Sequence, residues 1–136
     1  PLISKAGIRL DLQIEPSLPV IYIDRYRFQT ALLNLIQNAV EAMPAGGRIL
    51  ISARKDEAGK SIALAVGDDG RGIPTELLGK VCQPFFSTHT EEGMRGLGLA
   101  IVQDIVKIHN GRMTIESPQG GGTTVTLFFP DSRHDG

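Results

Sequence analysis

The sequence predicts an α+β fold, a two-layer α/β sandwich in which a mixed sheet of about five strands is covered on one face by about three helices. Two long stretches carry apolar residues at helical spacing, and the other apolar runs alternate with period two or are short and aliphatic. Their order is strand, helix, strand, strand, helix, strand, strand. This order is neither a regular alternation of strands and helices nor all-β, and it favours a sheet with helices on one face.

The first half of the chain predicts one strand, one long helix and a hairpin. Apolar side chains alternate over residues 8–14, as in an edge strand with one buried face. A stripe at helical spacing runs through residues 24–43, with Asp24 as its N-cap and a Pro-Ala-Gly-Gly segment as its end. Two aliphatic runs follow, residues 48–53 and 61–67, and the polar stretch between them predicts that they pair as a hairpin.

The middle of the chain predicts loops and one short helix. Residues 68–74 form a glycine-rich loop, and residues 75–81 follow it as a short helix. Residues 87–95 are polar and show no apolar period, which indicates a mobile surface loop.

The last third predicts a helix and two strands. Apolar residues recur at helical spacing over residues 97–108, and Asn110-Gly111 ends this helix because both residues tolerate left-handed backbone angles. Alternating residues at 113–115 and 125–129 predict two strands, joined by a turn at the glycines of 120–122.

Length and charge limit the classes of function. With 136 residues, 41% apolar and 21% charged, we expect one domain over residues 1–130 and a polar tail at 131–136. A formal net charge of −1, with acids and bases interleaved, argues against contact with nucleic acid or a membrane. No run approaches the ~18 apolar residues of a membrane span. The single cysteine, Cys82, fits a reducing interior, and we expect a soluble, cytoplasmic piece of a longer protein.

Two asparagines on the first helix are candidates for a metal site. At about 100° per residue, Asn34 and Asn38 lie one turn apart at the edge of the apolar stripe, near Ala31. An amide oxygen is a reasonable ligand for Mg²⁺, which usually keeps waters and substrate phosphates as its other ligands. The alternative is that both side chains brace the neighbouring backbone.

The segment DDGRGI, residues 68–73, follows a strand that has the composition of a buried one. A carboxylate at this strand end can accept a hydrogen bond from an exocyclic amine such as that of adenine, and glycines let a ligand approach the backbone. A plain turn is the alternative. A calcium loop is excluded because the Glu required at its twelfth position would be Gly79.

Two further glycine segments are candidates for ligand contacts. Gly96 and Gly98 open the second long helix, whose N-terminal N–H groups could bind phosphate, or they serve helix packing alone. A dinucleotide fingerprint is excluded because no strand precedes them, and no Gly-Lys-Ser/Thr of a P-loop occurs. The glycines of 120–122 form a turn by themselves, although Thr123 could reach a base.

In this order, the segments resemble the motifs of the GHKL nucleotide-binding superfamily, specifically of its histidine kinase branch. The likeness extends from about residue 8 to residue 130. NLIQNAVEA (34–42) is similar to the N box, DDGRGI (68–73) to the first glycine box, PFFST (84–88) to the F box, GLGLAIV (96–102) to the second glycine box and GGGTTVTLFFP (120–130) to the closing strand. The resemblance implies the Bergerat ATP-binding fold.

The resemblance implies a site for ATP and Mg²⁺ with residue roles carried over by position. Asn38 would ligate Mg²⁺, Asn34 would support it near the phosphates, and Asp68 would bind the adenine amino group. The base pocket would also contain Gly70, Gly72, Ile73 and Thr123. The phosphate side would contain Arg95, Gly96, Leu97, Gly98 and Leu99, with Glu41 and Ala42 beside the nucleotide. Residues 87–95 would be the ATP lid.

Asn34 decides between two reactions within the resemblance. The gyrase, MutL and heat-shock chaperone types hydrolyse ATP and carry a Glu at this position to activate water, whereas an amide cannot act as a general base. The resemblance therefore implies transfer of the γ-phosphoryl group to a delivered histidine. An ATPase, or a nucleotide-binding module with little activity, is the alternative.

The phosphate-accepting histidine is expected on another domain. His89, His109 and His134 lie in the lid, before the Asn-Gly stop and in the tail, and none has the acceptor motif of a histidine followed by an acidic residue on a dimerising helix. The implied partners are the dimerisation and histidine-phosphotransfer domain of the same parent protein and, downstream, a response regulator. We expect a protein-histidine kinase catalytic domain that does not autophosphorylate alone.

Three residues depart from the usual motifs. Met94 and Arg95 precede Gly96 where the family usually has Gly-Thr, and Arg95 is a candidate to supply positive charge to the γ-phosphate. His89 stands where the F box often ends in Lys, which could make nucleotide affinity depend weakly on pH. The segment NAVEAM (38–43), which contains Glu41, is most similar to sensor kinases of the nitrogen-regulation type.

Overall fold

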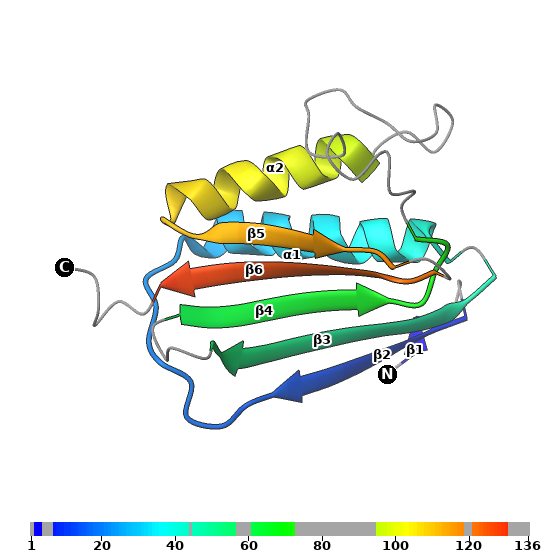
Figure 1. Ribbon diagram of the computed structural model, residues 1–136, viewed down its shortest axis with the longest axis horizontal. Helices are drawn as coiled ribbons and strands as arrows, with labels where there is room; N and C mark the ends of the chain where they lie inside the picture. The colour runs from blue at the N-terminus through cyan, green and yellow to red at the C-terminus, as the bar shows by residue number, and fades with distance from the viewer. Residues whose placement is uncertain are drawn as a thin grey trace.

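The computed structural model describes residues 2–3, 7–43, 45–56, 61–72, 95–118 and 121–130. Within these residues, six strands form one sheet and two helices lie on one of its faces (Figure 1). The predicted α+β sandwich is confirmed. The short helix expected at 75–81, most of the expected lid at 87–95 and the tail at 131–136 lie outside the described residues. No described helix is long and apolar enough to cross a membrane.

The sheet is mixed, with strand order β1-β2-β3-β4-β6-β5. The strands are β1 (Leu2–Ile3), β2 (Ile8–Ile14), β3 (Gly47–Lys55), β4 (Ser61–Asp68), β5 (Arg112–Glu116) and β6 (Thr123–Pro130), and the helices are α1 (Arg25–Glu41) and α2 (Arg95–Ile108). Only β2 and β3 pair in parallel among the described strands. Such a pair needs a crossover connection, which α1 provides. The expected β3–β4 hairpin is confirmed, whereas β1 was not predicted.

The core lies between the sheet and the two helices. The strand register places Ile51, Val66 and Val125 side by side on one face, and all three side chains are buried. The helices contribute the buried residues Ala31, Leu35 and Ala39 from α1 and Leu99, Val102 and Val106 from α2. Because a shift of one residue would turn every strand side chain to the opposite face, this core fixes the register of the ladder.

Local capping rules set the ends of both helices. The Oδ1 atom of Asp24 accepts hydrogen bonds from the N–H groups of Tyr26 at 2.9 Å and Arg27 at 3.1 Å, which confirms it as the N-cap of α1. At the end of α2, Asn110 takes a φ of 60°, and Gly111 donates to the carbonyl of Val106 at 2.9 Å. Arg95, predicted in the preceding loop, is instead the first residue of α2.

The two helices run antiparallel across the sheet, so the end of α1 and the start of α2 lie on the same side of the molecule (Figure 1). The end of β4 and the start of β6 meet on that side as well, because these strands pair Asp68 with Thr123. All the segments that the sequence selected for nucleotide contacts and that the structure describes therefore lie at one end of the sandwich.

Asp24→Ala should lower the melting temperature followed by circular dichroism, because it removes the cap of α1. The hydrogen bond from the Arg27 N–H is the main cause that lowers the pKa of the Asp24 carboxyl. Its contribution is therefore fully present above the unfolded pKa of about 3.9 and is lost as the pH falls through the lower folded pKa.

Asp24→Asn serves as the matched control, because it keeps a side-chain oxygen acceptor and removes only the charge. Its melting temperature should lie below that of the wild type at neutral pH and approach it at acid pH. A constant difference between the two proteins at every pH would contradict a stabilising carboxylate charge.

Candidate functional site

The candidate site is built where three segments meet, which are the end of α1, the loop after β4 and the loop before β6. Ala42, just after the last residue of α1, is 2% exposed, and its carbonyl oxygen accepts a hydrogen bond from the N–H of Arg71 at 3.2 Å. A Cβ atom on Gly70 would lie 2.5 Å from that same oxygen. The glycine is therefore needed because the loop packs directly against the helix end.

The second contact joins the loop after β4 to the loop before β6. The N–H of Gly122 donates to the carbonyl of Gly70 at 2.8 Å. Gly72 has a φ of +77°, and a Cβ there would lie 3.0 Å from Ser117 Oγ and 3.3 Å from the Gly122 oxygen. Gly121 has a φ of +109°, and a Cβ there would lie 2.9 Å from the Gly70 oxygen. Any side chain here would separate the two loops.

Asp68 and Thr123 face each other at the last pair of the β4–β6 ladder. The Oδ1 atom of Asp68 accepts a hydrogen bond from the N–H of Gly70 at 2.9 Å, which holds the first turn of the loop. The side chain of Thr123 is 2% exposed, and its Oγ1 lies 3.1 Å from Ser117 Oγ. The ladder thus brings together the carboxylate and the hydroxyl predicted to lie near a base.

A cavity of about 400 Å³ opens at this ladder end. Its lining residues are Asp68, Asp69, Pro118, Gly121, Gly122, Thr123 and Thr124. The volume lies in the usual range of ligand pockets, and the lining combines carboxylates, hydroxyls and bare glycine backbone. Such a surface can bind a flat polar group by hydrogen bonds.

The two asparagines lie on α1 as expected, at the boundary of the core. Asn38 is 7% exposed, and Asn34 is half-buried. The Nδ2 of Asn34 donates to the carbonyl of Thr30 at 2.7 Å, so this side chain does brace the backbone, as the alternative reading proposed. Its Oδ1 atom is a candidate acceptor or ligand.

Glu41 is the last residue of α1 and is also half-buried. Its Oε2 accepts from Gln37 Nε2 at the long distance of 3.5 Å. Within the part of the chain that the structure describes, its Oε1 atom is buried and has no hydrogen-bond partner. Since a buried carboxylate oxygen is costly to leave unpaired, Glu41 is a polar group that a ligand or water at the helix end could satisfy.

The predicted phosphate segment forms the first turn of α2. Arg95, Gly96, Leu97 and Gly98 lie in the helix backbone, and their side-chain surroundings are outside the described residues. Leu99 is 1% exposed and belongs to the core, so its side chain packs inside the protein and does not face a ligand. Ile73 also lies outside the described residues.

Sequence reasoning missed two residues that shape the site. Ser117 donates through Oγ to the Gly122 carbonyl at 2.9 Å and thereby closes the loop before β6. Asp69 accepts from the N–H of Arg48 at 2.9 Å, and a Cβ on Gly47 would overlap its carboxylate. The adjacency of Asp69 to Asp68 was visible in the sequence, but its partner lies 21 residues away, and no local signal indicates it.

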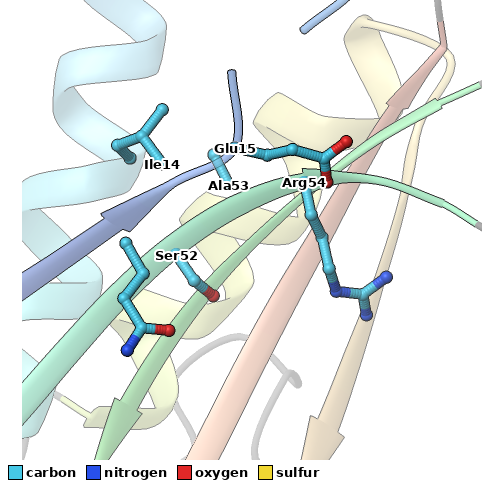
Figure 2. Close-up of a pocket in the computed structure, with 6 residues that line it drawn as sticks. Ile14, Glu15, Ser52, Ala53 and Arg54 are labelled. Atoms are coloured by element: carbon cyan, nitrogen blue, oxygen red, sulfur yellow. The ribbon is translucent and has the colours of Figure 1, made fainter. Parts of the chain in front are cut away.

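A second cavity, of about 450 Å³, lies at the far end of β2 and β3 and contains none of the predicted residues (Figure 2). It is lined by Gln13, Ile14, Glu15, Ser52, Ala53 and Arg54. Although it is slightly larger, it lacks the glycine backbone and the paired loops of the first cavity. Chemistry, rather than volume, identifies the ladder end as the candidate site.

Comparison with known proteins agrees with this geometry. A family model described as histidine kinase-, DNA gyrase B-, and HSP90-like ATPase matches residues 23–133. The chain belongs to this HATPase_c family. The match contains α1, the glycine loop, α2 and the closing strands, and thus every element of the candidate site.

Individual relatives are sensor histidine kinases. ZraS of Escherichia coli K12 is 37% identical over 90% of this chain and 26% of its own length. The catalytic domain of the histidine kinase ThkA has a TM-score of 0.81 and 31% identity, covering 95% of this chain and 84% of that chain. Full-length ShkA, solved in complex with AMPPNP, has a TM-score of 0.78 and 28% identity, covering 93% of this chain and 26% of that one.

These comparisons confirm the predicted family, its histidine kinase relatives and the fold. The chain spans only about a quarter of the length of ZraS and of ShkA. The activity, substrates and partners of a whole protein of that kind are therefore proposed below. The nitrogen-regulation subgroup stays a prediction.

Gly70→Ala should weaken the docking of the loop onto α1, because the new methyl group would overlap the Ala42 carbonyl. We expect the free energy of unfolding, measured by urea titration, to fall by about 1–3 kcal/mol. Gly67→Ala on β4 is the matched control, because its nearest neighbour is the Thr124 hydroxyl at 3.2 Å, a side-chain atom that can give way. Equal losses in the two variants would argue against the loop contact.

Proposed function

We propose that this chain binds Mg-ATP and transfers the γ-phosphoryl group to a histidine of a separate dimerisation and phosphoacceptor domain. The observation that carries the proposal is the pairing of Asp68 with Thr123 at a glycine-walled cavity. The carboxylate is a suitable acceptor for the adenine amino group, and the buried threonine hydroxyl lies beside it. The ShkA relative was solved with AMPPNP, a non-hydrolysable ATP analogue, on the same fold.

The proposed position of the adenine beside Asp68 sets the direction in which the rest of the nucleotide extends. From the cavity at the β4–β6 end, a triphosphate would extend toward the N-terminus of α2 and the last turns of α1, which lie on the same side of the sandwich (Figure 1). The 14-residue α2 offers unpaired backbone N–H groups and a positive dipole end there. The glycines Gly96 and Gly98 place no β-carbon in the way of a phosphate.

The fit to Mg²⁺ rests on the donor chemistry of α1. Asn38 provides an amide oxygen on a buried face of the helix, and Glu41 has a buried carboxylate oxygen one turn further on. A hard cation that takes one or two protein oxygens and fills its shell with phosphate and water matches this sparse set. When bound, Mg²⁺ would offset the charge of the transferring phosphoryl group.

Asn34 supports transfer over hydrolysis. Its amide nitrogen is committed to the Thr30 carbonyl at 2.7 Å, and neither end of an amide can take a proton from water at neutral pH. Without a general base, attack by water is slow, whereas a neutral imidazole needs no base to act as nucleophile. The site would position ATP and leave the nucleophile to a partner.

The parent protein supplies the remaining parts. We propose that the acceptor histidine belongs to another domain of the same parent chain, as the multidomain length of ZraS suggests. A response regulator would then take the phosphoryl group from that histidine. Because ATP is abundant in the cytoplasm, we place this domain there, whatever the topology of the parent.

Asp68→Asn should sharply reduce ATP affinity measured by isothermal titration, because its amide presents a donor as well as an acceptor to the adenine amino group. A lost charge-assisted hydrogen bond of about 1.5–3 kcal/mol corresponds to roughly 10- to 150-fold weaker binding. Asp104→Asn, on the exposed face of α2, is the control and should bind as the wild type does. Unchanged affinity in Asp68→Asn would overturn the base assignment.

Transfer is tested by mixing the chain with a matching dimerisation domain and radiolabelled ATP. We expect acid-labile label on the partner's histidine, little label on this chain alone, and little steady phosphate release. Binding of ATP without label on the partner would support a nucleotide-binding module instead. Rapid phosphate release without a partner would support an ATPase.

A further inference from the structure

His109 joins the two helices at the end of the sandwich opposite the candidate site. It follows the last residue of α2, and its Nε2 lies 2.9 Å from the backbone nitrogen of Asp24, the N-cap of α1. Its Nδ1 lies 2.8 Å from the carbonyl oxygen of Ile105 on its own helix. The residue is part-buried, and its contact with Asp24 joins positions that are 85 residues apart in sequence.

The two partners fix the tautomer of the ring. A backbone N–H can only donate and a carbonyl can only accept, so Nδ1 must carry the proton and Nε2 must be bare. The structure therefore requires a neutral His109 whose Nε2 accepts from the Asp24 N–H. A doubly protonated ring would place two donors against each other at this contact.

Aromatic packing holds the ring in place from the sheet side. The rings of His109 and Phe129 of β6 pack edge-on, with 6.1 Å between their centroids and an interplanar angle of 83°. Phe129 packs in the same way against Phe28 of α1, with a centroid distance of 6.2 Å and an angle of 64°. The left-handed Asn110 and the close approach of Gly111 to the Phe128 carbonyl turn the chain sharply after the ring. Helix α2, strand β6 and helix α1 are thus connected through one imidazole.

The charged groups around the contact come from the start of α1 and from the last turn of α2. The Asp24 carboxylate accepts from the first turn of α1 and pairs with Arg27 at 2.9 Å. Lys107 lies two residues before His109 on α2 and is exposed. The Asp24 side chain therefore caps its own helix while its backbone N–H is held by the other helix.

We propose that His109 is a positioning residue that sets how α1 lies against α2. The inference rests on the proposed function, because the helix ends that it would align are the ones assigned to phosphate and Mg²⁺. Asn38 lies 14 residues beyond Asp24, or about 21 Å along the helix at 1.5 Å per residue. A helix is stiff over this length, so a shift at the Asp24 end is carried to Asn38.

The sheet side of the site is independent of this contact. Asp68 and Thr123 belong to β4 and β6, and the strand ladder holds them. Loss of the His109 contact should therefore disturb the phosphate half of the site and spare the base half. This difference separates positioning from general destabilisation, which would weaken both halves.

The tautomer is tested directly by ¹⁵N NMR of the imidazole in the wild-type chain at neutral pH. We expect a protonated Nδ1 and an unprotonated Nε2. The opposite tautomer, or rapid exchange between the two, would overturn the proposal. This measurement involves no nucleotide, so it remains decisive even if the proposed function fails.

The positioning role is tested with His109→Phe and His109→Gln. Phenylalanine keeps the packing against Phe129 and removes the acceptor, whereas the Oε1 of glutamine can replace Nε2 as acceptor for the Asp24 N–H. We expect His109→Phe to bind Mg-ATP about fivefold more weakly, the factor that corresponds to one ordinary hydrogen bond. Adenosine, which occupies only the base half, should bind as it does to wild type, and His109→Gln should restore most of the Mg-ATP affinity.

The outcomes separate the two proposals. Equal weakening of adenosine and Mg-ATP, or no rescue by glutamine, would overturn the positioning role and leave ATP binding intact. Failure of the wild type to bind either ligand would overturn the proposed function instead. Thermal melting of both variants checks that they are folded. If His109→Phe is unfolded, His109→Ala takes its place, and full Mg-ATP affinity in that variant would contradict the proposal.

Discussion

The direct backbone contact between the end of α1 and the loop after β4 is the constraint on which the site depends. The Ala42 carbonyl accepts the Arg71 N–H, and no β-carbon fits at Gly70 between them. The carbonyl oxygen of Gly70 in turn accepts a hydrogen bond from the N–H of Gly122. One glycine thereby joins helix, loop and closing strand, so the carboxylate of Asp68 is held relative to both layers of the fold.

The core fixes the strand register on which this contact depends. Buried side chains on alternate positions of β3, β4 and β6 fix the strand register, and a slip of one residue would expose them all. The pairing of Asp68 with Thr123 is the last step of that ladder. The position of the site thus follows from apolar burial along the same ladder, which places Asp68 and Thr123 together without any ligand.

Interactions between residues close in sequence could be predicted, whereas contacts between distant segments could not. Asp24 and Asn110 were predicted correctly because a cap depends on neighbouring residues alone. Gly70 was singled out for a different reason, the approach of a ligand, whereas its nearest neighbour is the protein's own helix. Ser117, Asp69 and the short β1 were missed because their partners are set by the tertiary fold. The grouping of Asp68 with Thr123 came from family resemblance, which carries spatial information that periodicity lacks.

Family membership alone does not choose between transfer and hydrolysis, because the family description covers kinases, gyrase and chaperone ATPases alike. The choice rests on Asn34 and on what surrounds it. The Thr30 carbonyl oxygen accepts a hydrogen bond from its amide nitrogen at 2.7 Å. An ionised glutamate has no proton to donate and could not make this hydrogen bond. The local hydrogen bonding of α1 therefore suits an amide at this position, which agrees with the proposed transfer to a histidine of another domain.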